Sequence, residues 1–293
     1  MNRFSLWTLL AFVLNACSLT AQIKRPASSG FPFELSKEGH ILIHARINGV
    51  EGNFIFDTGA GLNMMTRKFA NKISELRKLD SFYTGHRATG EAIQVDLWET
   101  ESFQVGSFRV NKQIFSILDM DFPVDGLISL KSFEQTPITV DYRNKMIWIE
   151  TTKTMAQRLK QGQSIPIQLS DHRGWSLDIF LFVRLNNQLT LQLCLDSGAG
   201  SDVYRFSANH MSALQVDSLQ VKHKFKPSIF NSGTGNNYYF TTLKELSIPG
   251  TPIGVHDFKV TFIDHLLYDG ITSINWLGEM ITISIPDKKL IVN

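Results

Sequence analysis

One short motif occurs twice in this chain and limits the folds that the chain can adopt. The first copy, Phe-Ile-Phe-Asp-Thr-Gly-Ala-Gly, covers residues 54–61, and the second, Leu-Cys-Leu-Asp-Ser-Gly-Ala-Gly, covers residues 193–200. The apolar run in each copy is typical of a buried strand, and the Gly-Ala-Gly run is typical of a tight turn leaving that strand. Each copy therefore predicts one carboxylate, Asp57 or Asp196, at the end of a buried strand.

The repeat extends beyond this motif. An Asp-Gly-aliphatic segment follows each copy, and a hairpin of apolar strands closes each half of the chain. The matching segments are 124–130 and 268–274, and the matching hairpins are 141–149 and 281–292. Features that recur at one offset of about 140 residues indicate a duplication into two lobes rather than a solenoid. We interpret Asp125 and Asp269, in the downstream segments, as structural acids behind the two loops.

The pattern between these landmarks predicts an all-β fold with few short helices. Alternating apolar residues and short turns such as Asn-Gly are typical of half-buried strands joined by hairpins. Segment 67–79 instead has apolar side chains at helical spacing and predicts a helix. The chain has 293 residues, 43% of them apolar, which is enough for a core in each of two lobes. The expected organisation is a tether over 22–32, an N-terminal lobe over 33–152, a linker over 153–165 and a C-terminal lobe over 166–293.

Each half also contains a glycine-rich turn between two extended runs. These turns cover residues 83–90 and 231–236. Because glycine permits tight backbone turns, each of them is a candidate for the tip of a mobile hairpin, or flap. The glycines concerned are Gly85, Gly90, Gly233 and Gly235. A plain surface turn is the alternative that these residues leave open.

The N-terminal residues 1–21 have the features of an export signal. Arg3 is followed by an apolar run over 6–14, which is too short to span a bilayer comfortably. A Leu-Asn-Ala-Cys run resembles the bacterial lipobox, which would make Cys17 a lipid-modified N-terminus and a membrane attachment point. Alternatively, an ordinary signal peptidase would cleave after Ala21. Both routes predict an exported protein, in the periplasm, on the outer membrane as a lipoprotein, or outside the cell.

Composition and motifs argue against several classes of function. The formal net charge is +2 and the densest basic run, residues 222–226, is short, so we expect no nucleic-acid partner. His40 and His44 would share one face of a strand, but no third ligand has a recognisable spacing, so we expect no metal site. Cys194 is interpreted as a small buried hydrophobe rather than a catalytic thiol. No nucleophile elbow, phosphate loop or zinc-protease motif is present, and we expect no cofactor.

The duplicated motif resembles the signature of the aspartic peptidase clan, which includes retropepsins and pepsins. The resemblance covers both halves, over about residues 33–293. It implies two homologous retropepsin-like closed β-barrel lobes with the active site in the cleft between them. Both lobes lie in one chain, as in pepsins, which predicts a monomer. The short lobes and the export signal are typical of an exported bacterial form.

The resemblance also implies roles for the residues of the two motifs. Asp57 and Asp196 would form the catalytic dyad. The hydroxyl residue after each Asp would hydrogen-bond across the lobe junction, and the next glycine would leave backbone N–H groups facing the carboxylates. These supporting residues are Thr58, Gly59, Ser197 and Gly198.

The chain departs from the family pattern at three places. The segment behind each catalytic loop ends in Ser129 or Ser273, where the family usually has glycine. Gly61 and Gly200 follow the Gly-Ala pairs, where retropepsins tend to carry an acid that contacts the substrate backbone. The flap tyrosine of pepsins has no clear counterpart. The nearest candidates are Tyr83 and Tyr238.

A pair of aspartates held together implies a particular chemistry. Two carboxylates about 3 Å apart repel each other by roughly 5 kcal/mol at an effective dielectric constant of about 20, so they share one proton. The ionised member takes a proton from a water, and the protonated member donates to the scissile carbonyl oxygen. The sequence thus favours an aspartic endopeptidase that acts on peptides or proteins. The alternatives are a catalytically silent peptide- or glycan-binding protein of the cell envelope, and two aspartates that merely cap turns.

Overall fold

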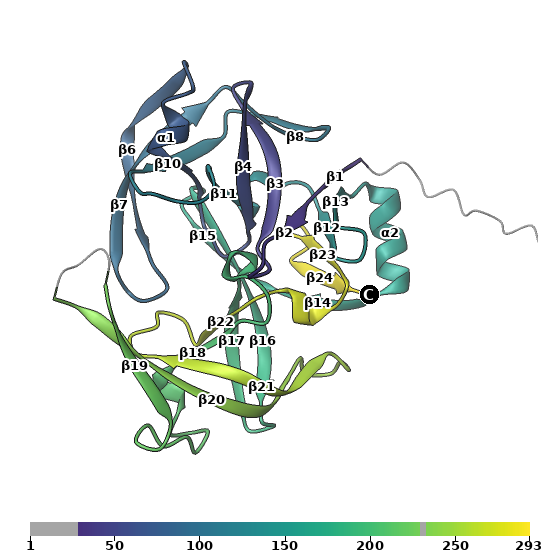
Figure 1. Ribbon diagram of the computed structural model, residues 1–293. Helices are drawn as coiled ribbons and strands as arrows, with labels where there is room; N and C mark the ends of the chain where they lie inside the picture. The colour runs from purple at the N-terminus through teal and green to yellow at the C-terminus, as the bar shows by residue number, and fades with distance from the viewer. Residues whose placement is uncertain (1–28, 229–232) are drawn as a thin grey trace, which may run out of the picture.

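The computed structural model describes residues 29–228 and 233–293, which form two lobes and a sheet beside them (Figure 1). The predicted export signal over 1–21, with Cys17, lies outside the described residues, as does most of the predicted tether. Within the described part of the chain, no helix is both long and apolar enough to cross a membrane. The prediction of an all-β, two-lobed fold with few short helices is confirmed.

The N-terminal lobe is built around a ten-stranded mixed sheet. Its order is β6-β7-β10-β5-β11-β4-β3-β8-β9, with β2 paired to β3. The hairpin of β3 and β4 turns at Asn48 and Gly49, both with positive φ, as the Asn-Gly signal predicts. The strands are β2 (Glu34–Leu35), β3 (Ile41–Ile47), β4 (Val50–Asp57), β5 (Asn63–Thr66), β6 (Leu76–His86), β7 (Ala92–Thr100), β8 (Ser102–Val105), β9 (Phe108–Asn111), β10 (Ile114–Leu118) and β11 (Gly126–Ser129).

The C-terminal lobe repeats this plan with an eight-stranded sheet. Its order is β15-β16-β17-β22-β18-β21-β20-β19, and an additional pairing of β16 with β20 closes the sheet on itself. The strands are β15 (Gln168–His172), β16 (Ser176–Leu185), β17 (Leu189–Leu195), β18 (Tyr204–Ser207), β19 (Lys222–Pro227), β20 (Gly235–Ser247), β21 (Gly254–Ile263) and β22 (Gly270–Thr272).

A third, six-stranded sheet joins the two halves. Its order is β1-β13-β12-β23-β24-β14, so each half supplies three strands. At its centre β12 pairs antiparallel with β23, and the hydroxyls of Thr139 and Thr282 lie 2.7 Å apart. The two closing hairpins that the sequence repeat matches therefore meet edge to edge. The strands are β1 (Gly30–Pro32), β12 (Ile138–Asp141), β13 (Met146–Ile149), β14 (Gln163–Pro166), β23 (Met280–Ser284) and β24 (Lys289–Val292).

The two strands that carry the motif occupy equivalent, buried positions. Strand β11 runs parallel beside β4 and places Ser129 opposite Asp57, while β22 runs parallel beside β17 and places Thr272 opposite Leu195. Phe56 and Leu195, which precede the two aspartates, are fully buried. Core packing on both faces thus fixes the directions in which the two strands end.

The helical segments are short. Two α-helices are present in the described residues, α1 and α2, together with four 3₁₀ turns. They are α1 (Arg67–Ala70), α2 (Thr152–Gln161), η1 (Leu130–Phe133), η2 (Ser197–Ala199), η3 (Ala208–His210) and η4 (Asn275–Leu277).

Three sequence-based boundaries differ from the structure. The helix predicted over 67–79 is correct only for α1, which ends at Ala70, because β6 begins at Leu76 and pairs with β7. Cross-strand pairing there outweighs the helical spacing of the apolar residues. The end of the predicted tether forms β1, since its backbone pairs with β13. The predicted linker contains α2, which Thr151 caps with its side chain, and most of β14.

Candidate active site

Asp57 and Asp196 lie next to each other at the junction of the two lobes. Asp57 ends β4, and Asp196 directly follows β17. Their carboxyl groups are hydrogen-bonded to each other, and Asp57 is 8% exposed. A Cβ on Gly198 would stand 2.2 Å from Cγ of Asp57, and a Cβ on Gly59 would stand 2.5 Å from Cγ of Asp196. Each glycine therefore leaves the space that the carboxyl group of the other half occupies.

The residues after the two aspartates lock the loops together through four reciprocal hydrogen bonds. The Thr58 hydroxyl donates to the carbonyl oxygen of Leu195 at 2.7 Å and accepts from the backbone N–H of Ser197 at 3.0 Å. The Ser197 hydroxyl donates to the carbonyl oxygen of Phe56 at 2.7 Å and accepts from the N–H of Thr58 at 3.0 Å. Both hydroxyl side chains are buried, so these bonds are shielded from water.

Backbone N–H groups fix the orientation of the Asp57 carboxyl group. The N–H groups of Gly59 and Ala60 both donate to Oδ1 of Asp57 at 2.9 Å. The N–H groups of Gly198 and Ala199 partly offset the rise in the pKa of Asp196 that burial causes, but the N–H of Ala199 donates to the backbone carbonyl oxygen of Asp196 at 3.3 Å. Because Oδ1 of Asp57 is held by its own loop, Oδ2 is left for the other carboxyl and for a ligand in the cleft.

Burial and proximity raise the pKa of the pair. Loss of hydration is the largest cause of the raised pKa of Asp57, and the charge of Asp196 is the second. The pKa of Asp196 is also raised by burial, although the positive charge of Arg205 partly offsets the shift. The two carboxyls therefore hold one proton between them over a pH range in which separate aspartates would be fully ionised.

The serines that replace the usual family glycine support the catalytic loops. The Ser129 hydroxyl donates to the carbonyl oxygen of Ala60, and its backbone N–H donates to Oδ1 of Asn63 at 2.8 Å. The Ser273 hydroxyl accepts from the backbone N–H of Val203 at 3.0 Å. Both serines are fully buried, so the small hydroxyl fits behind each loop and adds a hydrogen bond to it.

The downstream acids hold the backbone of the strands that deliver the dyad. Asp125 accepts from the N–H of Asn53 at 2.9 Å, and Asp269 accepts from the N–H of Gln192 at 3.1 Å. Each carboxyl group also has a basic neighbour. Nζ of Lys72 lies 3.5 Å from Oδ1 of Asp125, and Nε2 of His210 lies 3.0 Å from Oδ1 of Asp269. These contacts agree with the structural role expected for the two acids.

A cleft opens beside the dyad between the two lobes. It encloses a cavity of about 400 Å³. The first half of the chain contributes the loop after Asp57 and residues of β5, β6, β7, β10 and β11, and the second half contributes polar residues of β15 and β16 together with the segment before β22. The cavity is lined by Gly59, Ala60, Gly61, Leu62, Met64, Tyr83, Gly85, His86, Arg87, Ile93, Val95, Ser116, Leu118, Leu127, Ser170, His172, Ser176, Asp178, Leu267 and Tyr268.

Of the two candidate flap tyrosines, only Tyr83 lines this cavity. Its hydroxyl donates to the Ser176 hydroxyl at 2.9 Å, which joins the two halves across the cleft. Tyr238 instead packs against a small apolar cluster that includes Cys194, and the ammonium group of Lys226 lies over the Tyr238 ring. Cys194 is itself 2% exposed, and burial raises the pKa of its thiol, which agrees with its interpretation as a small hydrophobe.

The β6–β7 hairpin and the described part of the β19–β20 hairpin contact each other. The hairpin of β6 and β7 ends near residues 87–91, where Ala88 accepts from the N–H of Leu267 at 2.9 Å. Glu91 accepts a hydrogen bond from Ser228, which precedes the tip of the β19–β20 hairpin. Gly85 lines the cavity and Gly90 lies at the first tip. Gly233 and Gly235 belong to the second hairpin, of which residues 229–232 lie outside the described part.

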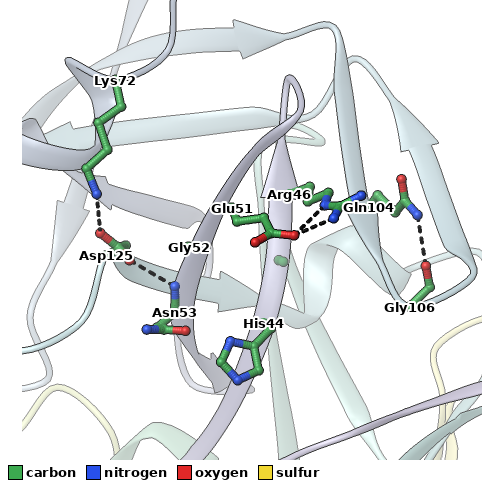
Figure 2. A pocket seen from close by; sticks show the side chains of 10 residues that line it. His44, Arg46, Glu51, Gly52, Asn53, Lys72, Gln104, Gly106 and Asp125 are labelled. Carbon is green, nitrogen blue, oxygen red and sulfur yellow. Dashed lines mark hydrogen bonds and ion pairs between the residues drawn. The ribbon is translucent and has the colours of Figure 1, made fainter.

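A separate hollow lies on the N-terminal lobe over β3 and β4 (Figure 2). Its charged side chains pair with one another, as Arg46 does with Glu51 and Lys72 with Asp125. No described residue of the second half lines it. We therefore do not assign the candidate active site to this hollow. His44 belongs to it, and among the described residues no cluster of three metal-ligating side chains occurs, with His44 or elsewhere.

Sequence reasoning predicted the pair of aspartates but assigned no role to several residues around it. Asp178 and Tyr268 line the cleft, and Arg205 lies outside it; all three interact electrostatically with Asp196. Asp178 and Arg205 belong to no motif, and Tyr268 only begins the matched segment 268–274. The sequence did contain one indication of a functional residue, because Asp178 is an acid within the apolar run of β16. Acidic side chains are rarely buried in a strand unless they are paired or functional.

Comparisons with known proteins agree with this geometry. The sequence profile of a family described as aspartyl protease matches residues 43–131, which include β4, Asp57 and the first flap. Among solved structures, basic 7S globulin from soybean has the same fold, with a TM-score of 0.56 over 90% of this chain and 94% of that chain at 9% sequence identity. No curated protein sequence matches. Together the fold, the partial family match and the paired aspartates support an aspartic-peptidase-like family.

Proposed function

We propose that the protein is an aspartic endopeptidase and that Asp57 and Asp196 are its catalytic dyad. The observation that carries the proposal is the hydrogen-bonded pair of buried carboxyls, one from each lobe. If the two aspartates only capped turns, the hydrogen bonds of Thr58 and Ser197 between the two loops would have no function. The same holds for the glycines, whose missing side chains leave room for the opposite carboxyl group.

The proposed reaction follows from the shared proton. A water between the carboxyls gives a proton to the ionised aspartate as its oxygen attacks the scissile carbonyl carbon. The protonated aspartate donates its proton to the carbonyl oxygen, which gives a neutral tetrahedral diol. Transfer of the first proton to the leaving nitrogen, while one hydroxyl of the diol returns its proton to the other aspartate, then breaks the C–N bond and releases a carboxylic acid and an amine. The dyad ends with one proton, as it began.

The cleft supports a polypeptide substrate. A cavity of about 400 Å³ beside the dyad has room for side chains of an extended peptide, and the β6–β7 hairpin forms part of its wall. We further propose that one chain is sufficient for activity, because both aspartates come from the same chain. Export by the signal over 1–21, with lipid attachment at Cys17 or cleavage after Ala21, remains part of this proposal and follows from the sequence alone.

The experiment that tests the proposal is a cleavage assay on an unstructured peptide library between about pH 3 and 7, read by mass spectrometry. The purified protein should cleave, and pepstatin-type inhibitors should block the cleavage. Asp57→Asn and Asp196→Asn should each abolish it. Asp257→Asn is the matched control and should keep full activity, since it changes an exposed acid of β21 outside the cleft. Cleavage that survives either dyad substitution would refute the assignment, and peptide binding without any cleavage would favour the silent binder.

A further inference from the structure

Asp178 places an additional carboxyl group in the cleft. It lies on β16, opposite Ser170 of β15. Its Oδ1 is 3.3 Å from the position that a Cβ on Gly61 would take, so the carboxyl reaches across to the catalytic loop of the other lobe. It lines the same cavity as Gly59 and Ala60, whose N–H groups hold Asp57. The group therefore lies within reach of a substrate residue close to the scissile bond.

This carboxyl has no partner within the described residues. No residue of 29–228 or 233–293 forms a hydrogen bond or ion pair with its oxygens, whereas the nearby acids Glu91 and Asp171 pair with Arg87 and Lys131. The ionisable groups that act on it are acidic or neutral. Burial, and in addition the charge of Asp196 directly after β17, raise its pKa to about 6. The thiol of Cys194 and the hydroxyl of Tyr268 lie close enough for the charge of Asp178 to raise their pKa values.

Two of the basic residues that line the cavity contact other groups. Arg87 pairs with Glu91, and the ring of His172 packs edge-on against Tyr83 with the ring centres 5.8 Å apart. A partly buried carboxylate without a counter-ion is unfavourable, since both burial and the neighbouring Asp196 disfavour its charge. A cation brought by a ligand would relieve this cost.

The rest of the cavity suits the stem of a long basic side chain. Its first-half wall is largely apolar, with Met64, Ile93 and Leu127 among the lining residues. Lysine and arginine bury an aliphatic stem along apolar surface and keep the charged head at a polar group. The hydroxyls of Ser176 and Tyr268 in the same cavity offer further acceptors.

We propose that Asp178 makes this part of the cleft a subsite for a basic side chain, so that preferred peptide substrates carry lysine or arginine next to the cleaved bond. This inference rests on the proposed function for its link to cleavage, and the Asp178 contact itself is a binding contact. The carboxylate would form a charge-assisted hydrogen bond with the lysine ammonium or the arginine guanidinium group.

The test compares peptides that differ only by lysine, methionine or glutamate at each position around the cleaved bond, at pH 7. For the wild type, kcat/KM should be about tenfold to a hundredfold higher for lysine than for methionine at one position, as expected for a hydrogen bond to a charged group. In Asp178→Asn this ratio should fall to near one. Asp171→Asn, which removes an acid from the adjacent strand outside the cavity, should leave the ratio unchanged. An unchanged ratio in Asp178→Asn would overturn the proposal.

A binding measurement separates this inference from the peptidase proposal. The same peptides, made with an uncleavable reduced-amide bond, are titrated into the wild type and both variants by calorimetry, with thermal unfolding as a check on folding. A lysine preference that Asp178→Asn removes, without cleavage of the natural peptides, supports the subsite and refutes the peptidase. Cleavage without a lysine preference refutes the subsite and leaves the peptidase standing. Absence of both refutes both.

Discussion

The reciprocal hydrogen bonds between the two catalytic loops are the structural feature most open to a quantitative test. In Thr58→Ala, the carbonyl oxygen of Leu195 and the N–H of Ser197 both lose their partner. Both groups lie where the loops are buried, and Ser197 is 2% exposed. Each buried polar group left without a partner costs about 1–3 kcal/mol, so the free energy of unfolding should fall by about 2–6 kcal/mol.

The matched control is Thr58→Ser, which keeps the hydroxyl and removes one methyl group. It should cost only about 1 kcal/mol. Urea unfolding followed by fluorescence measures both values, and kcat/KM for a cleaved peptide should fall with the first variant far more than with the second. Because Thr58 and Ser197 bond each other, the double variant with Ser197→Ala should be non-additive by more than about 0.5 kcal/mol. Equal losses for Thr58→Ala and Thr58→Ser, or additive single losses, would refute the interlocked arrangement.

Three further predictions concern the cleft. Asp178→Asn should raise the free energy of unfolding at pH 7 by about 3 kcal/mol, because the pKa of Asp178 rises from 3.8 to about 6 on folding. This gain should vanish below about pH 4, where the carboxyl is protonated in the folded and unfolded states. Urea unfolding measures the gain, and a gain that does not depend on pH would contradict the prediction. Gly59→Ala would bring a Cβ to 2.5 Å from Cγ of Asp196, so peptide cleavage should fall at least about 100-fold while circular dichroism stays native-like; full activity would contradict the geometry. Glu91→Gln weakens the hydrogen bond with Ser228 between the two hairpins, so the backbone amides of the β6–β7 hairpin should exchange their hydrogens faster. Unchanged exchange rates would count against this contact.

Much of the candidate site could be predicted from the sequence because its chemistry is local. Each aspartate, its hydroxyl residue and its glycines are contiguous, and the duplication indicates that two such loops exist. The pairing of the loops was expected from a family resemblance, and the structure places Asp57 and Asp196 together. The prediction that Asp125 and Asp269 are structural also agrees with their backbone contacts.

The features that the sequence did not predict depend on long-range pairing. The helical spacing over 67–79 gives way to a strand after Ala70 because β7, more than twenty residues later, supplies its partner. Asp178 carries no motif, and only the crossing of β16 under the catalytic loop brings it to Gly61. The sheet that joins the lobes likewise needs β12 and β23 to meet, which no local pattern specifies.

The most direct test of the shared proton is the pKa of Asp57, measured by carbon NMR of the aspartate carboxyls in the wild type and in Asp196→Asn. We predict a pKa well above the ordinary value near 3.8 in the wild type, because the carboxyl is buried beside a second one. In Asp196→Asn the pKa of Asp57 should fall, since the neighbouring charge is gone, and should stay above the ordinary value because the burial remains. An ordinary pKa for Asp57 in the wild type, or the same pKa in both proteins, would contradict the account.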